Sequence, residues 1–425
     1  MSNKKYGSFM GKLPQTYERF LDFGERRLRT DLRYILHGGF WLFLGQVTGV
    51  GTALVLAIAY AHYLPKEIYG NYKYILSILG TLALFTMTGM DAGVQKGVAR
   101  GREGIFWQAF KYRLGGGVIT TLLTCGVGLF YYLQGNILLS SIFFACAPFL
   151  VVMEPLGIYG ALLVGKKAFR ASSIYMLLLQ LGTAGAIVSA VIFSKSLFVL
   201  ILAYVASNVF FRIILFVSAT HSFPMNDAPD PEALSFGKHC TVFAILGSLS
   251  SRLDSILLFH FLGPVPLAIY SFAQAATNNI RASFKLITDT LAFPKFAGQD
   301  KALLKKTLLR KVYIAHAVTI PLAIVAILLI PLLYRLLFPT YMESIPYAQV
   351  LTAFLAFSPL RFISTSVNAQ ASAKIYYILN VTSTIVASIT LLVCIPLWGI
   401  WGAIIATGIQ QSISNALGLY LFKRM

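Results

Sequence analysis

The chain has 425 residues, of which 57% are hydrophobic and only 12% are charged. Soluble domains carry roughly a quarter charged residues, so this composition excludes an ordinary soluble domain and indicates a protein largely embedded in a membrane. The formal net charge of +20 does not indicate a nucleic-acid partner, because the basic residues stand in short clusters between apolar runs and no groove-reading motif accompanies them.

The first 37 residues are polar and rich in arginine, and we expect a cytoplasmic tail over 1–37. The tail is too long and too mixed in charge for a signal peptide. Within LDFGERRLRTDLRYIL, Leu28, Leu32 and Ile35 fall on one side of a helix among arginines. This part of the tail is either a helix lying flat on an anionic membrane surface or a solvated lead-in to the first span.

Twelve apolar segments follow, each long enough to be a transmembrane helix, which takes about 20 residues to cross about 30 Å of hydrocarbon. We expect an all-α polytopic membrane protein. An N-terminal six-helix bundle over 38–219 would have spans near 38–62, 71–90, 114–133, 137–163, 172–193 and 196–219. A C-terminal six-helix bundle over 239–425 would have spans near 239–262, 266–293, 313–338, 344–371, 374–396 and 400–422.

Two breaks organise these spans. The stretch THSFPMNDAPDPEALSFG is polar and rich in proline, which predicts a cytoplasmic linker over 220–238. The charge-free run from Ile375 to Phe422 is too long for one crossing, and IPLWGIWG, with Pro396 and two glycines, predicts a hairpin within it.

Lysine and arginine gather in every second connection, as in DAGVQKGVARGREG, GKKAFR and KFAGQDKALLKKTLLRK, while the opposite connections such as YLQGN are nearly bare. Because basic loops stay on the cytoplasmic side, we expect both termini in the cytoplasm and the protein in the cell (inner) membrane. None of the four cysteines forms a CxxC pair or a zinc spacing, and we expect no metal and no cofactor.

The two halves also echo one another in sequence. YLPKEIYGNYKY (63–74) matches FLGPVPLAIYSFAQ (261–274) with Leu64 against Leu262 and Tyr72 against Tyr270, and Lys166 matches Lys374 further on. Two halves with the same topology are related by a pseudo-two-fold axis along the membrane normal, with a binding site between them.

The hairpin YLPKEIYGNY, the stretch RLDSILLFHFLGPVPLAIYSFAQAATNNI running into LAFPKFAG, then LLFPTYMESIPYAQVL and GIWGAIIATGIQQSIS carry a resemblance that extends from residue 38 onward. The chain resembles the polysaccharide flippase family of the multidrug/oligosaccharidyl-lipid/polysaccharide exporter superfamily. The resemblance implies two six-helix bundles around a central cavity, which move oligosaccharides on a polyprenyl diphosphate carrier across the membrane.

Several charged residues lie near the predicted midplane, where each would cost on the order of 2.5–3.5 kcal/mol if it faced lipid. They should therefore face a paired or watery interior. Gln274, Asn278, Arg281, Lys285 and Asp289 recur every three or four residues, so they form one stripe along a helix. Asp254, two residues after Arg252, points away from it and is better placed to meet a cation on a neighbouring helix.

Two interpretations compete for these charges. Basic residues could pair with Glu154, Asp254 and Asp289 to lock helices together, and Glu154 could also be a protonatable coupling group. Alternatively, because bases outnumber acids, surplus guanidinium groups could line the cavity and hold a diphosphate. The candidate substrate-binding residues are Arg252, Arg281, Lys285, Arg361, Arg212, Asn278 and Gln274.

These features favour a flippase that moves polyprenyl-diphosphate-linked oligosaccharide to the outer leaflet by alternating access, for cell-surface polysaccharide biosynthesis. Its partners would be that lipid, the bilayer and other polysaccharide-assembly membrane proteins, with no nucleic acid. A cation-coupled multidrug exporter of the same fold is the main alternative, although a cationic drug would favour an acidic cavity. A membrane glycan polymerase or transferase is less favoured, because the outer loops are short and no HExxH, GxSxG or GxxxxGK[ST] string is present.

Overall fold

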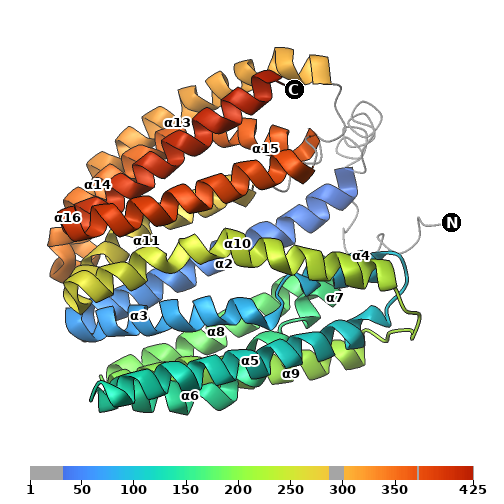
Figure 1. Cartoon of the computed structure of the whole chain (residues 1–425), viewed down its shortest axis with the longest axis horizontal. Helices are drawn as coiled ribbons and strands as arrows, with labels where there is room; N and C mark the ends of the chain where they lie inside the picture. The colour runs from blue at the N-terminus through green and yellow to red at the C-terminus, as the bar shows by residue number, and fades with distance from the viewer. Residues whose placement is uncertain (1–31, 287–300, 371–372, 425) are drawn as a thin grey trace, which may run out of the picture.

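A computed structural model describes residues 32–286, 301–370 and 373–424, and within these ranges the chain is helical with no strand (Figure 1). The predicted all-α class is therefore confirmed. Up to the linker the elements are α2 (Leu32–Tyr63), α3 (Lys66–Leu82), η1 (Ala83–Thr86), α4 (Met90–Ala99), α5 (Ile105–Leu133), α6 (Ile137–Leu156), α7 (Tyr159–Gly165), α8 (Phe169–Phe193) and α9 (Leu197–Ser222).

After the linker the elements are α10 (Pro231–Leu262), α11 (Pro264–Leu286), α13 (Lys301–Leu337), η3 (Pro339–Ser344), α14 (Ile345–Ala353), η4 (Phe354–Leu360), α15 (Arg361–Gln370) and α16 (Ala373–Arg424). In the N-terminal half, α6 packs on α5 and α9, and α8 packs on α9 and α2. In the C-terminal half, α14 packs on α11 and α13, and α15 on α16. α10 contacts α3 and α4 as well as α11 and α16, so it lies between the halves.

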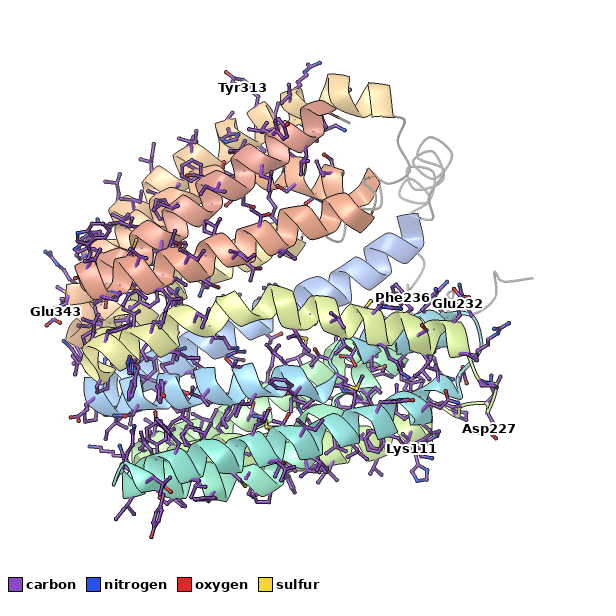
Figure 2. All side chains as sticks on the ribbon, in the orientation of Figure 1. Lys111, Asp227, Glu232, Phe236, Tyr313 and Glu343 are labelled. Atoms are coloured by element: carbon purple, nitrogen blue, oxygen red, sulfur yellow. The ribbon has the colours of Figure 1, made fainter. Side chains whose placement is uncertain are left out.

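The connections alternate between two ends of the molecule (Figure 1). The α5–α6 and α10–α11 turns lie at one end, which we call the turn end. The α9–α10 linker, the start of α2 and the finish of α16 lie at the other, the linker end. Glu343 marks the turn end, and Asp227 and Glu232 mark the linker end (Figure 2). The bare connections predicted to be extracellular thus lie opposite the basic ones.

The second predicted span, 71–90, differs from the prediction. α3 tightens into the 3₁₀ turn η1, Met87 takes a left-handed conformation with φ 57°, and α4 leaves at 48° to the preceding helix. α4 occupies part of the stretch DAGVQKGVARGREG, which had been assigned to a loop. A helix forms there because its apolar residues Met90, Val94 and Val98 recur every fourth position and are buried.

The linker is shorter than the predicted 220–238, because helix α9 continues to Ser222 and α10 begins at Pro231, leaving 223–230 non-helical. The sequence contains the start signal of α10. Asp230 Oδ1 accepts a hydrogen bond from the Ala233 amide at 3.0 Å, and Pro231 takes the first helical position. Likewise, 32–37 belong to α2, while the remainder of the predicted tail lies outside the described residues.

The predicted hairpin within the last apolar run is confirmed. The helical assignment of α16 runs through Gly399, but that residue has φ 57° and ψ −128°, and the chain reverses there (Figure 1). A Cβ on Gly402 would lie 1.9 Å from the Cys394 carbonyl oxygen, so the two arms approach too closely for any larger residue.

The structure supports a multi-pass membrane protein. Among the described residues, eight helices are long and apolar enough to cross a membrane, or nine if the bent α3–α4 segment counts as one span. α10 and α11 are not among them. Their polar residues, including Arg252, Asp254 and Gln274, lower the apolar character of both helices, and the same residues face the cavity described next.

Candidate binding cavity

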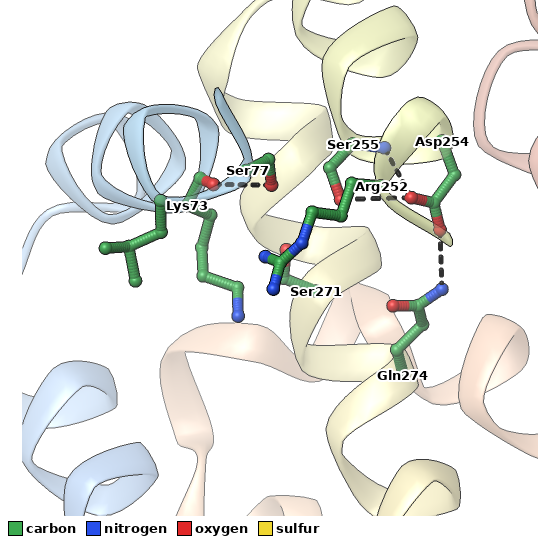
Figure 3. A pocket seen from close by; sticks show the side chains of 8 residues that line it. Lys73, Ser77, Arg252, Asp254, Ser255, Ser271 and Gln274 are labelled. Carbon is green, nitrogen blue, oxygen red and sulfur yellow. Dashed lines mark hydrogen bonds between the residues drawn. The ribbon is translucent and has the colours of Figure 1, made fainter. Parts of the chain in front are cut away.

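A cavity of about 260 Å³ lies between α3 of the N-terminal half and α10 and α11 of the C-terminal half (Figure 3). It is lined by Lys73, Leu76, Ser77, Arg252, Asp254, Ser255, Ser271 and Gln274. Most of these side chains are polar, although they lie midway along helices that are otherwise apolar. The cavity is therefore a polar chamber inside the predicted membrane region.

Helical spacing brings the polar residues of each helix to the cavity. On α3, Lys73 and Ser77 are four residues apart and share one face. On α11, Ser271 and Gln274 are three apart and also share a face. The cationic ends of Lys73 and Arg252 reach the same space from opposite halves (Figure 3).

Asp254 is held entirely by its own half. Its Oδ1 accepts hydrogen bonds from the Ser255 amide at 2.6 Å and the Ser255 hydroxyl at 3.2 Å. Its Oδ2 accepts from the Tyr270 hydroxyl at 3.0 Å and from Gln274 Nε2 at 2.9 Å. The expected cation on a neighbouring helix is thus replaced by neutral donors on α11. As expected, Asp254 forms no ion pair with Arg252 in the described part of the chain.

Lys73 and Arg252 are left without carboxylate partners among the described residues. No hydrogen bond or ion pair there reaches the guanidinium of Arg252, which is exposed to the cavity. The Lys73 ammonium, on a half-buried side chain, lies 5.9 Å from the Tyr69 ring centroid, a cation–π contact. Two cations thus face one chamber whose single carboxylate already has four donors.

A second group of charges lies within the N-terminal half, and its members pair with one another. Arg113, only 2% exposed, forms an ion pair with Asp91, and its Nη2 donates to the Glu154 carbonyl oxygen at 2.7 Å. Arg212 Nη1 lies 3.3 Å from Glu154 Oε1 and donates to the Met153 carbonyl at 2.5 Å. We call these four side chains the N-terminal charge cluster. With two arginines and two carboxylates, it is balanced.

The structure therefore separates the predicted site residues. Arg252, Asp254 and Gln274 meet at the cavity, whereas Arg212 lies against Glu154 in the charge cluster. Asn278 lies one turn beyond Gln274 on α11 and is exposed. Arg361, also exposed, begins α15 and does not line the cavity. α11 includes positions 281 and 285, but the side chains of Arg281 and Lys285, and all of Asp289, lie outside the described residues.

Two important residues were missed by sequence reasoning. Lys73 and Arg113 both stood close to predicted span ends, where basic residues are ordinarily interfacial. Lys73 faces the cavity because α3 begins earlier, at Lys66, and Arg113 is buried because α5 begins at Ile105. The spacing of Lys73 and Ser77 on one helical face was the signal that could have identified the first of them.

The two halves meet on both sides of the cavity. At the turn end, Lys66 pairs with Glu343 at 3.1 Å, and the Tyr69 ring of α3 packs on the Phe272 ring of α11 with centroids 4.9 Å apart. At the linker end, Glu232 Oε1 accepts from Lys96 at 2.8 Å, so α4 is joined to α10. The cavity is thus bounded at each end by contacts between halves.

Solved structures of membrane transporters share the fold of this chain. Lipid II flippase MurJ in an inward closed conformation aligns with a TM-score of 0.68 at 15% identity, over 91% of this chain and 87% of that one. An outward-facing multidrug resistance MATE transporter of the MOP superfamily aligns at 0.60 and 14%, over 91% and 94%. An inward-facing MATE structure gives 0.59 and 14%, over 89% and 94%.

Residues 35–300 match the family described as polysaccharide biosynthesis protein. The chain belongs to this family, and the predicted resemblance is confirmed. A search of curated proteins found no match.

Proposed function

We propose that the protein is a flippase that moves a polyprenyl-diphosphate-linked oligosaccharide from the cytoplasmic to the outer leaflet of the cell (inner) membrane. The observation that carries this proposal is the pair of cations, Lys73 and Arg252, which face one cavity without a carboxylate partner among the described residues. Two cations that face one cavity repel each other, and an anionic ligand placed between them would offset that repulsion.

A diphosphate suits this chamber better than a single carboxylate would. The Arg252 guanidinium offers parallel N–H donors that match phosphate oxygens, and the Lys73 ammonium adds a compact charge from the other side. Gln274 and Asn278 continue along α11 as polar groups that could contact the first sugar. Arg281 and Lys285 would extend this stripe, and Arg361 and Arg212 remain candidates for contacts made in another state of the cycle.

The transport cycle we propose is alternating access by two six-helix bundles, 38–219 and 239–425, related by an axis along the membrane normal and with both termini cytoplasmic. Rocking would separate the halves first at one end and then at the other. The contacts Lys66–Glu343 and Lys96–Glu232 cross between halves at opposite ends, so each would break in a different half-cycle. The prenyl tail would stay in lipid while the charged head crosses the chamber.

A cation-coupled multidrug exporter is the second candidate, because multidrug transporters share the fold. A cationic drug needs an accessible carboxylate, and the oxygens of Asp254 are occupied by Ser255, Tyr270 and Gln274. Glu154 is engaged by Arg212. We therefore favour the anionic lipid, and leave Glu154 as a group that could couple transport to a proton gradient.

The test measures binding of farnesyl diphosphate, a short prenyl diphosphate, to the full-length protein in lipid nanodiscs by calorimetry. Arg252→Ala and Lys73→Ala should each weaken binding by about ten- to a hundredfold, because each removes a charge-assisted contact of about 1.5–3 kcal/mol. Farnesol, which lacks the diphosphate, should bind weakly and equally to all three proteins. Arg335→Ala, an exposed arginine away from the cavity, is the matched control and should bind as the unchanged protein does.

Equal affinity of the unchanged protein for farnesyl diphosphate and farnesol would contradict the proposal. Tighter binding of a lipophilic cation such as tetraphenylphosphonium, weakened by Asp254→Asn, would favour the multidrug exporter instead.

A further inference from the structure

Gly80 lies against the guanidinium of Arg252, across the boundary between the two halves. A Cβ placed on Gly80 would stand 2.3 Å from Arg252 Cζ, 2.4 Å from Nη1 and 2.7 Å from Nε. Real atoms do not approach so closely, so the guanidinium occupies the space that any other residue at position 80 would fill. The absence of a side chain on α3 therefore creates a notch in which Arg252 of α10 rests.

The notch belongs to the face of α3 that lines the cavity. Lys73, Ser77 and Gly80 are spaced by four and three residues, so they lie one above another on the same side of the helix. Lys73 and Ser77 line the chamber directly. Helix α3 carries both Lys73 and the notch. It therefore places the Arg252 guanidinium in line with the Lys73 ammonium.

Glycine within a helix is otherwise unfavourable, because it loses more backbone entropy on folding than alanine. At Gly80 no positive φ requires it, since the residue is helical and α3 continues to Leu82. The glycine instead leaves space beside α3, and the guanidinium at the end of the flexible Arg252 side chain fills that space. A methyl group at this position would move the guanidinium rather than separate the two backbones.

We propose that Gly80 is a positioning residue of the binding site. The space beside Gly80 holds the Arg252 guanidinium in a position from which Arg252 and Lys73 can contact one anionic headgroup from opposite halves. This inference rests on the proposed function. It adds that the geometry of the site depends on contact between the halves, because the binding cation of one half is held by the helix of the other. If α3 separated from α10, the guanidinium would no longer be held in this position, and the affinity for the headgroup would fall.

The experiment is a double-mutant cycle between Gly80→Ala and Arg252→Ala, read by farnesyl diphosphate binding to the full-length protein in nanodiscs. Gly80→Ala alone should weaken binding by about tenfold, the effect of misplacing one charge-assisted contact. In the Arg252→Ala background the same change should have no further effect, because the group it displaces is gone. The melting temperature should be unchanged or higher, because alanine favours the helix.

Gly126→Ala is the matched control, since Gly126 lies in α5 and a Cβ there meets nothing within 4 Å. It should leave binding unchanged.

The outcomes separate the two proposals. Wild-type affinity in Gly80→Ala, with weakened binding in Arg252→Ala, would overturn the positioning role and leave the diphosphate site intact. An equal loss from Gly80→Ala in both backgrounds would also overturn it, because the glycine would then act independently of Arg252. Wild-type affinity in Arg252→Ala would overturn the proposed function itself, and the role of Gly80 with it.

Discussion

The N-terminal charge cluster and the central cavity place charges inside the same membrane protein in opposite ways. In the cluster, Arg113 and Arg212 face Asp91 and Glu154, so cations and carboxylates are equal in number. In the cavity, Lys73 and Arg252 share the space with one carboxylate, Asp254, whose oxygens are satisfied by neutral donors.

The difference separates charges that form ion pairs between helices from cations that face a cavity without a carboxylate partner among the described residues. A buried ion pair compensates its own desolvation only when both partners are well placed, and the cluster achieves this by joining α4, α5, α6 and α9. In the cavity, Asp254 forms an ion pair with neither cation in the part of the chain that the structure describes.

The largest expected effect is that of breaking the charge cluster. Arg113→Ala should lower the free energy of unfolding by about 3 kcal/mol, because it removes a fully buried side chain and takes the cation from Glu154 and from Asp91, whose side chain is 40% exposed. Denaturation of the purified protein in mixed micelles measures this. Arg252→Ala should change the same quantity by no more than about 0.5 kcal/mol, because Arg252 has no such partner among the described residues. Equal destabilisation by both variants would remove the distinction between the two regions.

A smaller effect is expected from loosening Asp254. Tyr270→Phe removes the hydroxyl that donates to Asp254 Oδ2 and accepts from Gln274 at 2.6 Å, and it should cost about 1–3 kcal/mol of stability. The freed carboxylate oxygen could then turn to Arg252 or Lys73, so farnesyl diphosphate should also bind more weakly.

Tyr334→Phe is the control for this variant, since the Tyr334 hydroxyl is also buried but donates to the Phe272 backbone carbonyl. It should cost stability without changing affinity. A Tyr270→Phe variant that binds as tightly as the unchanged protein would show that neutralising Asp254 is unimportant to the site.

The smallest effect should come from an ion pair outside the predicted spans. Hydrogen bonds from Arg100 and Lys96 lower the pKa of Glu232 to about 2. A carboxyl whose pKa is lower in the folded state stabilises the fold above its unfolded pKa and loses that contribution as the pH falls through the folded pKa.

The melting-temperature difference between the unchanged protein and Glu232→Gln should therefore be small and constant from pH 5 to 8 by this linkage, shrinking as the pH falls from about 4.5 toward 2. It should also shrink at high salt. If Glu232→Gln lowered the melting temperature as much as Arg113→Ala, the exposed ion pair would contribute as much stability as the buried one, and exposure would not explain the difference between them.

Local sequence pattern predicted much of the fold and only part of the site. The apolar runs and the glycines around Pro396 predicted helices and the final hairpin, because each depends on a few neighbouring residues. The break after α3 and the helix α4 were missed, since charge and glycine near a span end are typical of loops. Arg252 and Gln274 were predicted to face the interior because polar residues inside apolar runs stand out, and both line the cavity.

The sequence by itself determined that this chain is a helical membrane protein, because the thickness of the hydrocarbon and the rise of a helix fix the length of the apolar runs. It also determined the polysaccharide biosynthesis family, through the match over residues 35–300. Only the tertiary structure decided which charges have partners. Arg212 and Arg252 look alike in sequence, yet one meets Glu154 and the other rests in the notch of Gly80. Pairing depends on distances between helices far apart in the chain, and no local pattern contains those distances.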